Sequence, residues 1–125
     1  MIRISVGEDI DIRSEIESVK DAEAGAVVTF LGTVRREKGR VKEIAYEGYP
    51  GMTEKSLRKI ADEARSLFGL INVVIVHRTG VIPAGGDVVF IAVSASHRRA
   101  AFESCSWIID RIKEVVPIWK EIINE

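Results

Sequence analysis

Two stretches of the chain alternate apolar and polar residues, a pattern that predicts β-strands with one buried face. The first is Met1–Val6, and the second is Val41–Tyr49, in which Ile44 and Tyr46 share a face. Longer apolar runs rich in β-branched residues predict buried strands. These runs are Gly25–Arg35, Ile71–His77 and Val88–Ser94.

Apolar residues spaced three and four apart predict three helices. The first, Ile12–Lys20, is short. The second has Thr53 as its predicted N-cap, and Gly69 is a suitable C-cap because glycine adopts left-handed backbone angles without strain. Each helix therefore has one apolar side that can cover a sheet.

The third helix is predicted to begin at Ser96 or His97. Pro117 is expected to kink or end it, because proline cannot donate an N–H to the carbonyl of Lys113. Its predicted buried face contains Ala101, Cys105, Ile108, Ile112 and Val115.

Turns complete the predicted order of elements. Glu37–Arg40 is predicted to be a polar turn or mobile loop, and Pro83–Asp87 a turn. The resulting order is β-α-β-β-α-β-β-α. The chain has 125 residues and neither a repeat nor a linker, so residues 1–125 are expected to form one α+β domain, a mainly antiparallel sheet flanked by helices.

Composition narrows the classes of function. The formal net charge is −1, whereas nucleic-acid binders usually have a basic balance, so any anion site must be local. Cys105 is the one cysteine, which excludes an internal disulfide and cysteine clusters for zinc, and no residues show metal-ligand spacing. The chain start lacks a signal-peptide core, and no apolar run approaches the roughly 20 residues of a membrane helix. We expect a cytoplasmic protein that needs no cofactor.

Three basic residues, His97, Arg98 and Arg99, stand where the last strand ends and the last helix begins. Free backbone N–H groups and the helix dipole favour an anion at such a place. Basic side chains there oppose the dipole, which is slightly unfavourable unless a ligand balances them. The pattern favours a phosphate or carboxylate site over an ordinary solvated helix start.

Lys113 and Lys120 are seven residues apart, so an unbroken helix would place both on one face. Lys113 adjoins the apolar Ile109 and Ile112. Partial desolvation among other cations would lower its pKa and allow it to act as an acid, base or nucleophile. The alternative is that both are ordinary solvated lysines.

Further basic residues, Arg35, Arg36, Lys38 and Arg40, surround a glycine-containing turn that could fold over an anion or form a solvated hairpin tip. Cys105 falls in the apolar stripe of the last helix, so we interpret it as a small hydrophobic residue and not as a nucleophile. His77 has no acidic residue nearby, and we interpret it as structural or surface-exposed.

Four segments resemble the large, catalytic subunit of molybdopterin synthase, and together they run from about Gly25 to Lys120. They are GAVVTFLGTVR, YEGYPGMTEKSLRKIADEA, HRTGVIPAGGDVVFIAVSASHRRAAF and IIDRIKEVVPIWKE, in this order. The resemblance implies an α/β-hammerhead fold and a homodimer. It also implies a small ubiquitin-like sulfur-carrier subunit, which ends in a Gly-Gly thiocarboxylate, so the whole assembly would be a heterotetramer.

The resemblance further implies a sulfurtransferase of molybdenum cofactor biosynthesis, which adds two sulfurs to cyclic pyranopterin monophosphate to form the molybdopterin dithiolene. The motifs assign Lys113 and Lys120 as catalytic, and Arg35, His97 and Arg98 as substrate-binding. Arg36 and Arg99 would be additional anion contacts. Members of this family commonly continue beyond the Trp-Lys segment, so we expect contacts from such a tail to be missing or replaced.

Two other functions remain open at this point. A non-catalytic module of the same fold would bind an anion or a partner through its basic helix, although the presence of both lysines argues against lost chemistry. A thiol enzyme that depends on Cys105 would be sensitive to alkylation.

Overall fold

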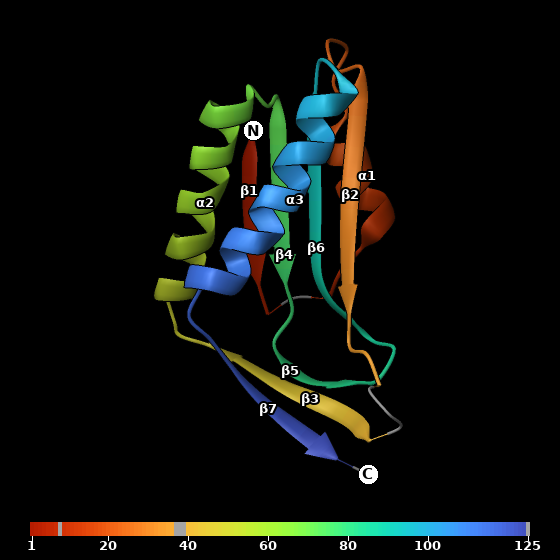
Figure 1. The fold of residues 1–125 in the computed structure, drawn as a ribbon, viewed down its shortest axis with the longest axis vertical. Coiled ribbons are helices and arrows are strands. Elements are labelled where there is room, and N and C mark those ends of the chain that lie inside the picture. The colour runs from red at the N-terminus through yellow and green to blue at the C-terminus, as the bar shows by residue number, and fades with distance from the viewer. Residues whose placement is uncertain (8, 37–39, 125) are drawn as a thin grey trace.

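The computed structural model describes residues 1–7, 9–36 and 40–124 and contains two β-sheets with three helices (Figure 1). The elements follow in the order β1 (Ile2–Val6), α1 (Ile12–Val19), β2 (Ala26–Thr33), β3 (Val41–Gly48), α2 (Met52–Phe68), β4 (Asn72–His77), β5 (Gly80–Pro83), β6 (Asp87–Ala95), α3 (Arg98–Val115) and β7 (Ile118–Asn124). The α+β class is therefore confirmed.

The larger sheet has the strand order β1-β4-β6-β2. Only β1 and β4 run parallel, and the other two pairings are antiparallel. All six residues of β4 are buried, because helices cover both faces of the sheet at this strand. This explains why Ile71–His77 has a continuous apolar run instead of an alternating one.

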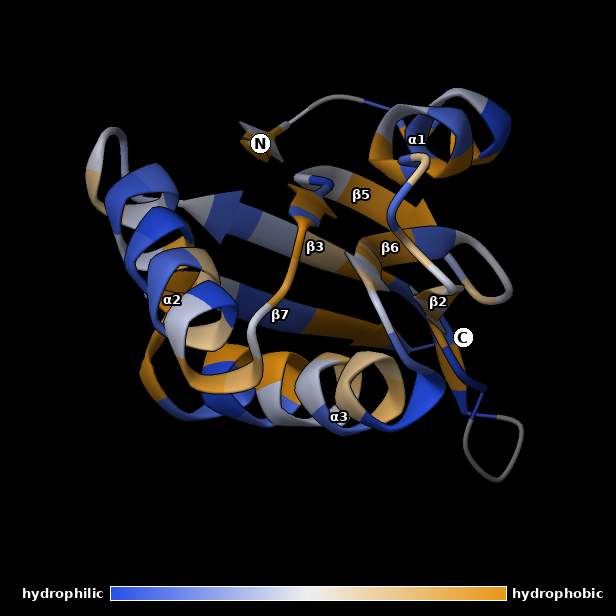
Figure 2. Cartoon of the chain, turned by 90° about the horizontal axis from the view of Figure 1, so that it is seen from above, coloured by the Kyte–Doolittle hydropathy of each residue, from blue (hydrophilic) through white to orange (hydrophobic). Residues whose placement is uncertain are grey.

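The helices form two layers around this sheet, α2 and α3 on one face and α1 on the other (Figure 2). Alternate residues of β4 pack against the two helix layers. Val73 and Ile75 belong to the core under α2 and α3, whereas Val74 and Val76 belong to the core under α1. The predicted buried face of α3 is confirmed except at Val115, which is 47% exposed because the helix ends there.

The smaller, antiparallel sheet has the order β5-β3-β7 and lies at the lower end of the molecule, beneath the ends of α3 and β2 (Figure 1). Val34, Ile44, Ile82 and Val88 form its core. This arrangement agrees with the expected α/β-hammerhead type. Residues 37–39 of the predicted Glu37–Arg40 turn lie outside the described residues.

Two strands, β5 and β7, were not predicted from the sequence. β7 has the larger consequence, because the sequence suggested a helix that kinks or ends near Pro117 and no strand after it. The helix in fact ends at Val115, and Val116 is already extended (φ −79°, ψ 126°). The chain then pairs with β3 over its whole length, which places Lys120 opposite Tyr46. The predicted end of the helix near Pro117 is confirmed, so the unbroken helix that would have placed Lys113 and Lys120 on one face is not formed.

Thr53 is not the N-cap of α2, as the sequence suggested, since Gly51 occupies that position with a φ of 79°. Thr53 is fully buried instead. Its hydroxyl accepts a hydrogen bond from the Tyr49 N–H and donates one to the Pro117 carbonyl, both at 2.8 Å. Thr53 therefore fixes the start of β7 to the turn between β3 and α2.

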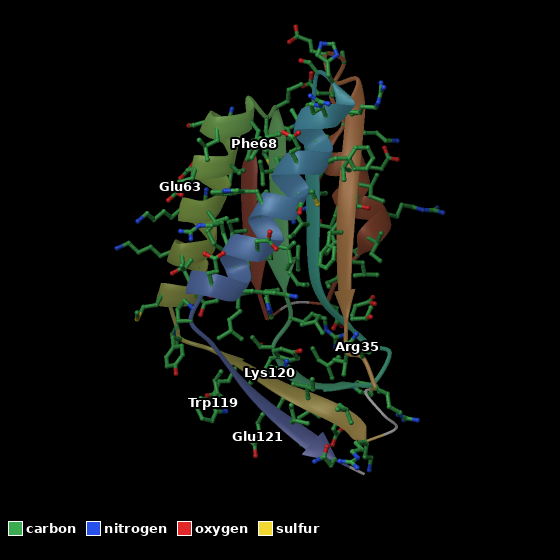
Figure 3. All side chains as sticks on the ribbon, viewed as in Figure 1. Arg35, Glu63, Phe68, Trp119, Lys120 and Glu121 are labelled. Atoms are coloured by element: carbon green, nitrogen blue, oxygen red, sulfur yellow. The ribbon has the colours of Figure 1, made fainter. Side chains whose placement is uncertain are left out.

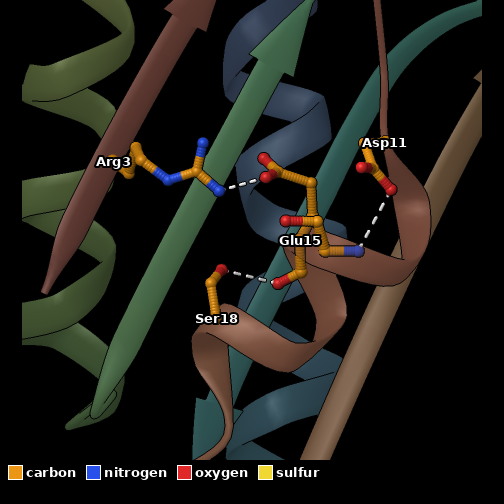
Figure 4. Close-up of polar contacts among 5 residues, drawn as sticks. Arg3, Asp11, Glu15 and Ser18 are labelled. Carbon is orange, nitrogen blue, oxygen red and sulfur yellow. Dashed lines mark hydrogen bonds and ion pairs between the residues drawn. The ribbon is translucent and has the colours of Figure 1, made fainter.

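An ion pair between Arg3 of β1 and Glu15 of α1 joins the smaller helix layer to the sheet (Figure 4). The Glu15 side chain is only 7% exposed, and its Oε2 atom is buried without a hydrogen-bond partner among the described residues. Asp11 caps the same helix by accepting from the Ser14 N–H at 3.2 Å.

Replacing Arg3 with alanine is expected to lower the free energy of unfolding by about 2 kcal/mol, because the buried Glu15 carboxylate would lose its cation. Denaturant unfolding measures this change. Arg13→Ala is the control, since Arg13 is exposed on the same helix. If both variants lost the same stability, the ion pair would not be the cause.

The described helices include none that is both long and apolar enough to cross a membrane.

Candidate functional site

A cavity of about 780 Å³ opens where α3, β2 and the smaller sheet meet. Residues at helical spacing and residues at strand spacing line this cavity. From α3 and the residue after it come Ile109, Ile112, Lys113 and Val116, which recur at helical spacing, and from β7 come the alternate residues Ile118, Lys120 and Ile122. The cavity size is typical of small-molecule sites.

Three of the residues singled out from the sequence, Arg35, Lys113 and Lys120, line this one cavity. Arg35 follows the end of β2. Lys120 lies on the side of β7 that faces α3, whereas Trp119 and Glu121 lie on the other side (Figure 3). No acidic residue is among the described residues that line the cavity, so its charge is positive.

The side chains of Lys113 and Lys120 are both exposed in this chain. The sequence suggested that Lys113 would be partly desolvated beside Ile109 and Ile112. Those two residues do line the cavity with it, but Lys113 itself is exposed. Desolvation of either lysine therefore has to come from a bound ligand or another chain.

The other predicted anion contacts lie elsewhere. Arg36 donates a hydrogen bond from Nε to the Val41 carbonyl at 3.3 Å. Arg36 is not among the described residues that line the cavity, whereas Arg35 is. Arg99 forms a 3.9 Å ion pair with Glu103 on its own helix, so both side chains extend along the exposed face of α3.

His97 and Arg98 stand at the opposite end of α3 from the cavity (Figure 1). The predicted helix start is confirmed, since His97 is the N-cap. Lys113 is four turns further along, which at 1.5 Å per residue is roughly 22 Å from Arg98. The side chains of His97 and Arg98 are exposed and have no hydrogen bond or ion pair within the described parts of the chain. One chain alone cannot bring this pair to Lys113 and Lys120.

His77 is the cavity residue that the sequence interpretation missed. It ends β4, is only 6% exposed, and lines the same cavity as the lysines. Tyr46 contacts it edge to face, with ring centroids 5.8 Å apart. Burial lowers the pKa of His77 and raises that of Tyr46, so both side chains are neutral near pH 7. The sequence did contain a signal for this residue, namely a titratable side chain at the end of a continuous apolar run.

Cys105 is buried in the core between α3 and the sheet, as predicted. Burial raises the pKa of its thiol to about 11. The thiolate is the nucleophilic form of cysteine, and almost none is present at neutral pH.

A second cavity, of about 560 Å³, adjoins β3 and β5 on another side of the smaller sheet. Its charged lining residues are Glu47 and Glu54, which do not suit an anionic ligand. Among the described residues, no three His, Cys, Asp or Glu side chains gather closely enough to hold a metal ion.

The chain is similar in sequence and fold to known proteins. The family described as "MoaE protein" matches residues 5–115. The molybdopterin synthase catalytic subunit of Pyrococcus abyssi is 40% identical over 120 residues, which is 94% of this chain and 81% of that protein.

Two solved structures are also similar. The crystal structure of molybdopterin synthase from Staphylococcus aureus has a TM-score of 0.90 and 40% identity, and the match covers 98% of this chain and 90% of that one. A complex of subunits 1 and 2 of the molybdopterin-converting factor from Helicobacter pylori shares the fold, with a TM-score of 0.78, 22% identity and coverage of 99% and 85%. The chain belongs to the MoaE family, the family of molybdopterin synthase catalytic subunits.

Proposed function

We propose that this chain transfers sulfur from the C-terminal thiocarboxylate of a small ubiquitin-like subunit to cyclic pyranopterin monophosphate, forming the dithiolene of molybdopterin. The observation that carries the proposal is the convergence of Arg35, Lys113 and Lys120 from three separate elements on one cavity. Both reactants are anions, and a cavity with cationic and no acidic lining residues among those described attracts both.

The cavity residues have distinct roles in this proposal. Arg35 binds the substrate phosphate, because a guanidinium matches phosphate oxygens with two parallel hydrogen bonds. Lys113 and Lys120 stabilise the thiocarboxylate and the negative charge that develops when its sulfur attacks. Lys113 also transfers a proton or attacks covalently, and Lys120 orients the substrate or the tail of the small subunit. Each tail delivers one sulfur, so each product needs two deliveries.

The small subunit is supported by the Helicobacter pylori structure, which is a complex of two different subunits on the same fold. It is also supported by the exposure of both lysines, which leaves room for an incoming tail. A tail that enters the cavity would exclude water from the two ammonium groups and strengthen their effect on charge.

A homodimer completes the site in this proposal. His97 and Arg98 are exposed at the far end of α3 and have no partner among the described residues, although their chemistry suits phosphate binding. A second copy related by a two-fold axis can supply them to the cavity, and each copy then gives and receives the same residues. Two chains with two small subunits make the heterotetramer.

Reconstitution tests the proposed function. The purified chain is combined with a thiocarboxylated small subunit and cyclic pyranopterin monophosphate, and molybdopterin is measured as its oxidised fluorescent derivative. We expect product in proportion to the thiocarboxylate supplied. A folded protein that binds the small subunit but forms no product would favour the non-catalytic module instead.

Cys105→Ala is expected to retain full product formation in the same assay, because a buried thiol with a pKa of about 11 is not a nucleophile at neutral pH. The expected effect is on stability, a loss of about 1 kcal/mol for the small cavity left in the core. Thermal unfolding measures that loss. Inactivation of the natural chain by an alkylating reagent, together with an inactive Cys105→Ala variant, would support a thiol mechanism.

A further inference from the structure

Among the described residues that line the cavity, His77 is the one buried titratable side chain that the proposed chemistry does not use. Its Nδ1 lies 2.8 Å from the carbonyl oxygen of Arg78. A carbonyl oxygen only accepts hydrogen bonds, so Nδ1 carries the proton and donates it there. In the neutral imidazole, Nε2 then holds a lone pair and can only accept.

The other ring nitrogen, Nε2, belongs to a residue that lines the cavity. It has no hydrogen-bond partner among the described residues, and it is not among the fully enclosed side-chain atoms that lack one. Since the ring as a whole is 6% exposed, the accessible part is small, and the surface that it lines is the cavity that holds Lys113 and Lys120.

Every other polar side chain in the described lining can donate a hydrogen bond. Arg35, Lys113 and Lys120 only donate, and the hydroxyls of Thr33 and Tyr46 donate or accept. The neutral imidazole is therefore the one described lining side chain that demands a donor from the ligand. The cations therefore bind the anionic part of a ligand, whereas His77 binds a part of the ligand that carries a hydrogen-bond donor.

We propose that Nε2 of His77 binds an N–H donor of the pterin ring of the substrate, and so orients the ring while the cations hold the phosphate. This inference rests on the proposed function, because it assumes the same substrate in the same cavity. It makes His77 a binding residue whose side chain sets specificity for a nitrogen heterocycle with a hydrogen-bond donor.

Protonation of His77 would remove the acceptor, because Nε2 would then donate. Within one chain, the charged and titratable groups facing this region are Tyr46 from β3, Lys113 from α3, Lys120 from β7 and Arg35 after β2. The proposed homodimer adds His97 and Arg98 of the second copy, which the Gln variant described below leaves unchanged. The neighbouring Arg78 side chain is held by the Asp87 carbonyl and by Asp9. Burial lowers the pKa of His77, so affinity is expected to be constant near pH 7 and to fall only below the ordinary histidine range near 6.5.

The test is calorimetric titration of the homodimer with cyclic pyranopterin monophosphate, without the small subunit, over a range of acidic to neutral pH. His77→Phe keeps an aromatic ring and loses the acceptor, and we expect its dissociation constant at pH 7 to rise about 10-fold or more. His77→Gln can present a carbonyl oxygen near the position of Nε2, and is expected to recover part of the affinity and to lose the decline at acidic pH.

The Gln variant also controls for titration of the substrate, which is the same for both proteins. Unchanged affinity in His77→Phe, or an acidic decline that persists in His77→Gln, would overturn the inference. Because the titration does not involve sulfur transfer, binding through His77 without product in the reconstitution would contradict the proposed function alone. Product formation with no change in affinity on His77→Phe would contradict this inference alone.

Discussion

Lys113→Ala is expected to lower product formation at least about 1,000-fold, because the variant loses both charge stabilisation and proton transfer at the reacting atoms. The fold should remain intact. Lys113 is exposed near the end of α3, and exposed substitutions of this kind change stability by about 0.5 kcal/mol or less. Single-turnover formation of the fluorescent product, measured beside thermal unfolding, separates the two effects.

Two matched variants make this result specific. Lys59→Ala removes an exposed lysine from α2, outside the cavity, and should leave the rate unchanged. Lys113→Arg keeps the positive charge but cannot give up a proton at neutral pH, so its activity measures how much of the effect is electrostatic. Near-normal product formation by Lys113→Ala would remove Lys113 from the mechanism.

Mixing two inactive variants is expected to restore activity if the site contains residues of two chains. The first variant carries His97→Ala and Arg98→Ala, and the second carries Lys113→Ala. Half of the randomly mixed dimers contain one chain of each kind, and each of these has one intact site of two, so about a quarter of the natural activity should return. The measurement is product formation after the two proteins are unfolded, mixed and refolded together.

The control for this experiment is a mixture of Lys113→Ala with Lys120→Ala. Both lysines line the cavity of one chain, so neither site of a mixed dimer is intact and no activity should return. Restoration in this control would mean that the two lysines act in different sites. No restoration in the first mixture would mean that His97 and Arg98 act within their own chain or not at all.

The sequence predicted the four strands of the larger sheet and all three helices because their apolar patterns are regular, although it did not separate the strands into two sheets. The six buried residues of β4 and the regular apolar face of α3 leave little ambiguity. β7 was missed because its sequence, IWKEIIN, does not alternate apolar and polar residues and closely follows a helix. Its strand conformation depends on pairing with β3, about 75 residues earlier, and such tertiary pairing cannot be read from local pattern.

The candidate site was predictable in its residue types and not in its geometry. Arg35, Lys113 and Lys120 were identified from charge and motif, but the two lysines are grouped by a strand after the helix and not by an unbroken helix face. They meet because β7 turns back beneath α3. His77 was missed because its sequence neighbours hold no acid, and its significance comes from the cavity beside it and the Arg78 carbonyl.

The support of β7 by Thr53 and β3 has a consequence for the order of folding. Every strand of the larger sheet and all three helices precede Pro117, so none of the pairings of that sheet depends on β7. Lys120 reaches the cavity only when the last strand closes a loop back to β3. A chain cut after Val116 should therefore fold its larger sheet and lack the site, and in refolding the larger sheet can form before the proposed activity appears.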